Sequence, residues 1–246
     1  MSFCLGIKVR DGLVAIADTR ITTGSERITA RKLNVYSEGD GNFFVMTSGL
    51  RSVRDKILTY YAEQRQHDNA SSDRLFKVVN RFSSLMRNVA EEDKAHLEES
   101  GLPFNSHLII GGQLAGDSEH KLYLMYPQGN WIEIGEGSPY QIIGTSSYGK
   151  PVIDRVLTFE DSMEDALKVG VLSFDSTRIS AADVGFPIDV ALYRSGSYSM
   201  IEHRYALSDL IEVTQWWQDA LRSALHELPS AWIASAFHEP HDSRLS

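Results

Sequence analysis

Ser2 directly follows Met1 and begins an apolar run, Phe3–Val9, that is typical of a buried strand. Removal of Met1 would leave Ser2 with both a hydroxyl and a free α-amine. A serine hydroxyl is a weak nucleophile unless a base takes its proton, and an α-amine with a pKa of about 8 can be that base. Ser2 could therefore supply nucleophile and base together, which is the N-terminal variant of nucleophilic catalysis.

Asp18 and Lys32 are the residues that could tune such a centre. A nearby ammonium group favours the deprotonated form of an amine, and a carboxylate can hold that ammonium in place. The residues alone leave a second interpretation open, in which Asp18 belongs to an exposed turn and Lys32 is solvated.

The Asp11-Gly12 pair predicts the hairpin that would bring Asp18 back toward Ser2. If Arg10 pairs with Leu13, then Cys4 lies opposite Thr19, and Asp18 returns to the level of Ser2. A shift of one residue in this register would decide which face of the sheet carries Asp18.

The remaining apolar patterns predict strands, two helices, strands, two helices, strands and a closing helix. The predicted strands are Phe3–Val9, Leu13–Ala17, Leu33–Tyr36, Phe43–Thr47, His107–Ile110, Lys121–Tyr126, Trp131–Ile134, Tyr140–Ile143, Ile188–Tyr193 and Ser199–Tyr205. The predicted helices are Leu50–Tyr61, Leu75–Val89, Lys150–Leu157, Met163–Phe174 and Leu210–Leu228. Short links between neighbouring strands favour antiparallel sheets. We therefore expect an α+β chain, a four-layer αββα sandwich, as one domain over 1–246 with a C-terminal extension at 229–246.

Composition narrows the class of partner and the compartment. The 246 residues carry a net charge of −9, which argues against nucleic acid because phosphate binding needs a basic surface. No apolar run reaches the roughly 20 residues that span a bilayer, and charged residues interrupt the N-terminal run where a signal peptide would be apolar. The single cysteine, Cys4, favours a reducing, cytoplasmic compartment.

Two candidate cofactor motifs lack their structural context. Gly111–Gly116 resembles a phosphate loop, but a polar turn and a strand follow it instead of a helix. Pro240 interrupts the possible metal cluster His238–Asp242, and its spacing differs from that of zinc sites. We expect no metal and no other cofactor.

Several spaced motifs together resemble the proteasome β-subunit family. These are Ser2 before a short strand, Asp18-Thr19-Arg20 after the second strand, Lys32 after a loop, and Ser48-Gly49 before a helix. Residues Ile143–Arg155 and Val184–Asp189 are similar to the bacterial ancestral beta subunit (Anbu) branch of that family. The resemblance extends over most of the chain.

This resemblance implies an N-terminal-nucleophile hydrolase of the threonine/serine endopeptidase type. It assigns Ser2 as nucleophile, Asp18 and Lys32 as an electrostatic pair, and Arg20 as a support for the active-site loop. It also implies that the backbone N–H of Gly49 binds the oxyanion, a contribution of about 10²–10³ in rate in other enzymes.

The resemblance assigns a second group of residues less directly. Thr145 and Ser146 stand where the family has a turn that contacts the amine of the nucleophile. The family pattern Asp-x-x-Ser-Gly corresponds to Ser180 through Asp183 and Val184, with acid and hydroxyl exchanged. The usual nucleophile is threonine, so Ser2 is also a departure.

Peptides or unfolded proteins are the implied substrates, and a homo-oligomer, as a ring or open ring, is the implied assembly. A separate ATPase would have to unfold protein substrates. Two alternatives to a peptidase remain: an inactive ring subunit of the same fold, and an amidase of small molecules. Trp232, Ile233 and Phe237 predict that the C-terminal tail packs on a neighbouring subunit or folds back onto its own helices.

Overall fold

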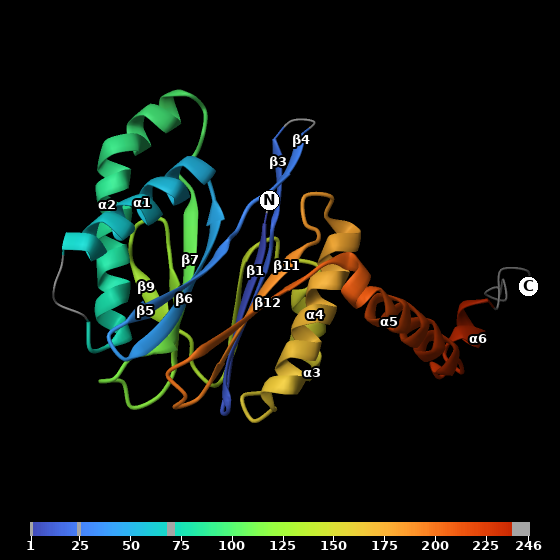
Figure 1. Cartoon of the computed structure of the whole chain (residues 1–246). Coiled ribbons are helices and arrows are strands. Elements are labelled where there is room, and N and C mark those ends of the chain that lie inside the picture. The colour runs from blue at the N-terminus through green and yellow to red at the C-terminus, as the bar shows by residue number, and fades with distance from the viewer. Residues whose placement is uncertain (1, 24–25, 68–71, 238–246) are drawn as a thin grey trace, which may run out of the picture. The chain divides into compact units, whose positions relative to one another are not determined.

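The computed structural model describes residues 2–23, 26–67 and 72–237 (Figure 1). The strands are β1 (Phe3–Val9), β2 (Gly12–Asp18), β3 (Arg20–Thr23), β4 (Glu26–Thr29), β5 (Leu33–Glu38), β6 (Gly41–Gly49), β7 (Ser106–Gln113), β8 (Lys121–Met125), β9 (Trp131–Glu133), β10 (Tyr140–Gly144), β11 (Ile188–Arg194) and β12 (Met200–Tyr205). The helices are α1 (Arg51–His67), α2 (Leu75–Glu99), α3 (Lys150–Val156), α4 (Met163–Ser180), α5 (Leu207–Glu227) and α6 (Ile233–Ala236). Two compact units divide the chain, Met1–Asp209 and Leu210–Ser246.

Two five-stranded antiparallel sheets form the centre of the first unit. One has the strand order β10-β1-β2-β11-β12, and the other has the order β5-β6-β7-β8-β9. All residues of β1 and β2 are buried, because each strand lies between two neighbours and has packed layers on both faces. Figure 1 shows α1 and α2 on one side of the paired sheets and α3 and α4 on the other. This arrangement confirms the predicted αββα sandwich.

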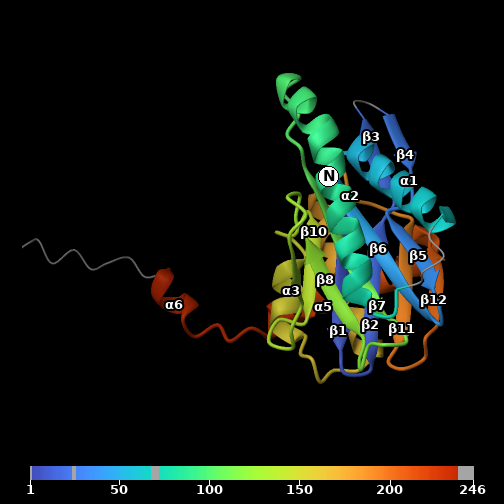
Figure 2. The same ribbon diagram turned by 90° about the vertical axis from the view of Figure 1, so that its left-hand side faces the viewer.

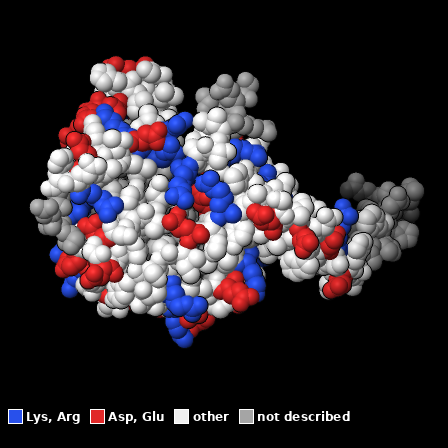
Figure 3. All heavy atoms as spheres, viewed as in Figure 1, with Lys and Arg blue, Asp and Glu red and all other residues white. Residues whose placement is uncertain are grey.

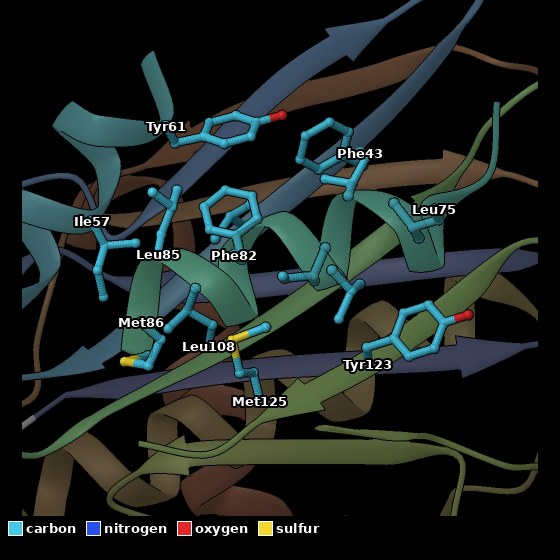
Figure 4. Close-up of a cluster of buried hydrophobic side chains, with 14 of the residues drawn as sticks. Phe43, Ile57, Tyr61, Leu75, Phe82, Leu85, Met86, Leu108, Tyr123 and Met125 are labelled. Atoms are coloured by element: carbon cyan, nitrogen blue, oxygen red, sulfur yellow. The ribbon is translucent and has the colours of Figure 1, made fainter. Parts of the chain in front are cut away.

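The helix α2 packs on the second sheet through a stripe of apolar residues at helical spacing. Phe82 stacks on Tyr61 of α1, with ring centroids 4.3 Å apart, and Met86 belongs to the same cluster (Figure 4). Figure 2 shows α2 in front of the second sheet, where it contacts β7 and β8, while α1 contacts β6. This packing fixes the start of α1 relative to the end of β6.

The helix α4 covers the first sheet. A Cβ added at its Gly170 would lie 2.6 Å from Cδ1 of Ile16, so helix and sheet approach closely here. Between the sheets, Cys4, Leu13 and Ala15 pack against Phe44 and other residues of the second sheet in one buried cluster. The start of β1 is thus held from both faces.

The register predicted for the first hairpin is wrong by two residues. Val9 pairs with Gly12 and Cys4 pairs with Ala17, so the turn consists of Arg10 and Asp11 alone. Gly12 belongs to the strand because its Cα packs against β11, where an added Cβ would lie 2.0 Å from the carbonyl oxygen of Tyr193. A shift of two residues leaves each side chain on its expected face.

Sequence patterns missed two short strands. Arg20–Thr23 and Glu26–Thr29 form a separate hairpin, β3-β4, whose polar sequence gives little strand signal. Helix α4 also continues six residues beyond the predicted Phe174, to Ser180.

The second unit, Leu210–Ser246, contains most of α5 and all of α6. It begins ahead of Pro229, where the sequence places the C-terminal extension. Large apolar side chains of α5 are exposed, among them Trp216, Leu221 and Leu225. None of the helices in the described ranges is long and apolar enough to cross a membrane.

Candidate active site

Ser2 lies at the beginning of β1, and hydrogen bonds hold the backbone on both sides of it. The carbonyl oxygen of Ser2 accepts a hydrogen bond from Thr145 N at 2.7 Å. The next amide, Phe3 N, donates to Asp18 Oδ1 at 2.8 Å. Because β1 pairs with both β2 and β10, the position of Ser2 is set by two neighbouring strands.

Asp18 and Lys32 form a buried ion pair next to this strand end. Lys32 Nζ lies 2.6 Å from Asp18 Oδ1 and donates a second hydrogen bond to the carbonyl oxygen of Arg20 at 2.7 Å. Asp18 is 0% exposed and Lys32 is 2% exposed. The solvated alternative for these residues is therefore wrong in the folded chain.

Burial has the largest effect on the pKa of the Asp18 carboxyl. It raises the pKa of Asp18, while the Lys32 ammonium and the N–H groups of Phe3 and Arg20 lower that pKa. The carboxylate oxygens accept three hydrogen bonds in all from these donors. Asp18 thus ties together β1, the start of β3 and the lysine side chain.

A pocket of about 590 Å³ opens beside Ser2. Its lining contains Lys32 and Gly49, which the sequence had singled out, together with Gly144. The further lining residues are Ile21, Thr47, Ser48, Leu50, Arg51, Arg54, Pro103 and Asn105. Ser2, the lysine of the buried pair and the end of β6 thus meet around one cavity.

Gly49 ends β6 in a conformation that suits glycine. Its φ is +125°, and an added Cβ would lie 2.1 Å from the carbonyl oxygen of Asn105. The residue pairs with Ser106 across the β6-β7 ladder, and α1 starts two residues later, at Arg51. The backbone of Gly49 is therefore fixed at the edge of the pocket.

Arg20 holds the loop that follows α4. Its Nη1 donates to the carbonyl oxygens of Ala182 at 3.1 Å and Val184 at 3.3 Å. The guanidinium lies against Gly185, where an added Cβ would be 2.2 Å from Cζ. Thr19 adds a hydrogen bond from Oγ1 to the carbonyl oxygen of Pro187 at 2.7 Å.

The second group of predicted residues is only partly brought to the pocket. Thr145 is buried and contacts Ser2 through its backbone N–H. Ser146 is half-buried, and its carbonyl oxygen accepts a hydrogen bond from Lys150 N at 3.0 Å. Ser180 is exposed at the end of α4, and Asp183 is half-buried in the loop that Arg20 holds. None of these four is among the described residues that line the pocket.

Sequence reasoning missed the two arginines of the pocket. Arg51 and Arg54 occupy the first turn of α1, directly after Ser48-Gly49. Their place right behind a recognised motif was the signal that could have identified them.

Cys4 lies beneath the site and is not a second nucleophile. Its Sγ is 3.6 Å from the carbonyl oxygen of Thr47. Burial raises the pKa of the Cys4 thiol to about 12, so the thiolate is a rare form at neutral pH. In the ranges that the structure describes, no three His, Cys, Asp or Glu residues are grouped to hold a metal ion. The cluster His238–Asp242 lies outside these ranges.

Comparisons with known proteins agree with this fold. The model of the proteasome subunit family matches residues 2–192. A solved helical assembly of the Anbu complex from Pseudomonas aeruginosa is 30% identical, with a TM-score of 0.88, and the alignment covers 96% of this chain and 100% of that one. Anbu (ancestral beta-subunit) from Yersinia bercovieri is 28% identical, with a TM-score of 0.85, over 92% of this chain and 97% of that one.

A more distant relative is the proteasome subunit alpha of Methanoregula boonei. It is 24% identical over 186 residues, which are 75% of this chain and 71% of the relative. With the family match over most of the chain and the Anbu structures superimposing along nearly its whole length, the chain belongs to the proteasome subunit family, in its Anbu branch.

Proposed function

We propose that this chain is a peptidase that cleaves peptide bonds with Ser2 as an N-terminal nucleophile, after removal of Met1. The observation that carries the proposal is the buried Asp18–Lys32 pair, whose lysine lines the same pocket as Ser2. Met1 itself lies outside the described residues. An ammonium that lines the same pocket as Ser2 favours the neutral form of a free α-amine there, and the neutral amine is the form that acts as a base.

The chemistry follows in two halves. In the first, the α-amine of Ser2 takes the hydroxyl proton while Oγ attacks the substrate carbonyl carbon, and the negative charge on the carbonyl oxygen is stabilised by the N–H of Gly49. The protonated α-amine then gives its proton to the leaving amine, and the C–N bond breaks. The acyl group remains on Ser2 as an ester. In the second half, the α-amine takes a proton from water as the water oxygen attacks the ester carbonyl carbon. The ester C–O bond then breaks, and the protonated amine returns its proton to Oγ, which frees the acid product and Ser2.

The other residues position this centre. The Lys32 ammonium favours the neutral form of the α-amine, and Asp18 fixes both Lys32 and the amide of Phe3. Arg20 steadies the loop Ala182–Val184. Thr145 holds the Ser2 carbonyl through its backbone N–H, next to the pocket that Ser2 lines.

The test combines the intact mass of the purified full chain with peptide cleavage. We expect a mass without Met1 and turnover of denatured polypeptide, detected by mass spectrometry of the products. Ser2→Ala should abolish turnover and leave the circular dichroism spectrum unchanged, because a small residue at the start of β1 opens no cavity. Unchanged turnover in Ser2→Ala contradicts the proposal, and absence of any turnover favours the inactive ring subunit. Hydrolysis of small amides alone favours the amidase.

We also propose that the chain works as a homo-oligomer, as a ring or open ring, in the cytoplasm. Exposed apolar side chains on α5, such as Trp216 and Leu225, support self-association, as does the helical assembly of the Pseudomonas aeruginosa relative. A separate ATPase would supply the energy for unfolding protein substrates.

A further inference from the structure

Basic side chains dominate the pocket beside Ser2. Lys32, Arg51 and Arg54 line it, and the lining found in the described ranges contains no Asp or Glu. On the face shown in Figure 3, Lys and Arg side chains gather near the middle of the first unit, with acidic side chains next to them. The positive character of the pocket itself depends on how far two nearby carboxylates neutralise it, the buried Asp18 and the exposed Asp55 of α1.

The carboxylates neutralise it incompletely. Asp18 is matched by Lys32. Asp55 bonds both arginines, with Oδ1 2.6 Å from Nη2 of Arg54 and Oδ2 3.2 Å from Nε of Arg51. One carboxylate thus serves two guanidinium groups, and a second anion would complete the charge balance.

Arg54 is the better placed of the two arginines. Its side chain is 12% exposed, whereas those of Arg51 and Asp55 are 56% and 49% exposed. A charge-assisted hydrogen bond gains more where water is largely excluded. A carboxylate that enters the pocket would accordingly gain more from Arg54 than from Arg51.

Two further features of the wall favour an anion. Thr47 lines the pocket and is 3% exposed, and its buried hydroxyl lacks a hydrogen-bond acceptor among the described residues. The first turn of α1, which begins at Arg51, contains no acidic residue, so the positive end of the helix dipole is not neutralised within that turn.

We propose that this pocket binds the acidic side chain of the residue before the scissile bond, so that the chain cleaves after Asp or Glu. The inference rests on the proposed peptidase function, because Ser2 and Gly49, which line the pocket, would place the reacting carbonyl there. The side chain next to that carbonyl would then point toward Arg54 and Thr47. At about 590 Å³ the pocket is larger than a glutamate side chain needs, so charge would select the residue more than shape.

Binding to the full-length Ser2→Ala chain tests the pocket without chemistry. The probes are pairs of N-acetylated, C-terminally amidated peptides that differ only in one internal Glu or Gln, so the side chain is the sole source of a carboxylate. We expect the Glu peptide to bind about tenfold more tightly than the Gln peptide. Arg54→Gln in the same background should remove most of this difference. Arg155→Gln, an exposed arginine on α3 outside the pocket, should retain it.

Equal affinity of the two peptides, or no binding of either, overturns the inference. A Glu preference that survives Arg54→Gln also overturns it. A circular dichroism spectrum of Arg54→Gln that matches that of its parent shows that any loss of preference reflects charge and not misfolding. Free glutarate without a peptide separates the two sources of carboxylate: competition by glutarate as strong as that of the Glu peptide would mean that the pocket is only a small-anion site, contrary to the proposal.

Cleavage by the chain with Ser2 intact separates this inference from the proposed function. Cleavage that depends on Ser2 but follows Leu or Lys at least as often as Glu overturns the acidic preference and leaves the peptidase in place. Selective binding of the Glu peptide without any cleavage does the reverse, because it supports the pocket and contradicts the peptidase.

Discussion

The Lys32 ammonium lies 2.6 Å from Asp18 Oδ1, and both side chains are almost completely removed from solvent. The same carboxylate accepts the backbone N–H of Phe3, the residue that follows Ser2. A single buried contact therefore links the ionic pair to the backbone of the proposed nucleophile. The stability of the fold should therefore depend on whether one or both side chains of the pair are replaced, whereas peptide cleavage should be lost in either case.

Asp18→Asn should destabilise the fold by about 3–5 kcal/mol, because it leaves the Lys32 ammonium buried without a counter-charge. The double variant Asp18→Asn with Lys32→Met removes both charges, so it should be more stable than Asp18→Asn alone. Both variants should lose peptide cleavage. Urea unfolding of Asp18→Asn, of Lys32→Met and of the double variant measures the coupling, and additive losses would show that the two side chains do not interact.

Gly49→Ala should reduce stability and cleavage together. The positive φ and the close carbonyl oxygen of Asn105 leave no room for a methyl group, so we expect a loss of about 1–3 kcal/mol. The displaced N–H should also lower kcat by up to about 10²–10³. Gly137→Ala is the matched control, since an added Cβ there meets no atom within 4 Å. A wild-type kcat in Gly49→Ala would exclude this N–H from the oxyanion site.

The sequence patterns predicted the sandwich because its strands are short, apolar and separated by turn residues. The bounds of Phe3–Val9 agree with β1, where both faces of the strand are buried. The hairpin register failed because the tight packing of Gly12 on Tyr193 of β11 is a long-range contact that no local pattern contains. The β3-β4 hairpin was missed for a different reason, namely that its strands are polar and four residues each.

The candidate site likewise contains residues that the sequence predicted and residues that it did not. The pairing of Asp18 with Lys32 could be expected from the residue types and from the family resemblance. The contribution of Arg51 and Arg54 was missed. Their place behind Ser48-Gly49 was a signal, but whether they reach the pocket depends on where α1 starts relative to β1 of the other sheet. Charge on a helix is most often solvated, and only the fold brings these two arginines to the Ser2 pocket.

A buried histidine should make stability depend on pH. His120 Nε2 contacts the carbonyl oxygen of Val9 at 2.8 Å, and its Nδ1 is 3.2 Å from Ser195 Oγ. Burial lowers the pKa of His120 below its ordinary 6.5 and outweighs the hydrogen bond to Val9, which raises that pKa; nearby Lys8 adds to the lowering. The folded state therefore favours the neutral ring, so its stability is fully kept above pH 6.5 and is lost as the pH falls below that value.

The loss should be up to about 1.4 kcal/mol per pH unit until the pH passes the folded-state pKa. Urea unfolding at pH 7.5 and 5.5 gives the difference for the wild type and for His120→Gln, which has no titrating ring. We expect the variant to be less stable at pH 7.5 but to lose less on acidification. Equal losses in both proteins would assign the pH dependence to carboxylates elsewhere.

The exposed apolar side chains of the second unit provide the last prediction. Trp216 is 62% exposed and Leu225 is 67% exposed, and side chains of this size seldom face water on an isolated subunit. Light scattering at micromolar concentration should give a mass well above the 27.5 kDa of one chain. Trp216→Glu should lower that mass, because it places a charge in an apolar contact, while Gln218→Glu adds the same charge at a polar position of the helix and should leave the mass unchanged. A wild-type mass of one chain would exclude a stable ring at that concentration.

Truncation after Pro229 examines the tail separately. A shorter chain that keeps its oligomeric mass but melts at a lower temperature would show that Trp232 and Phe237 stabilise their own subunit.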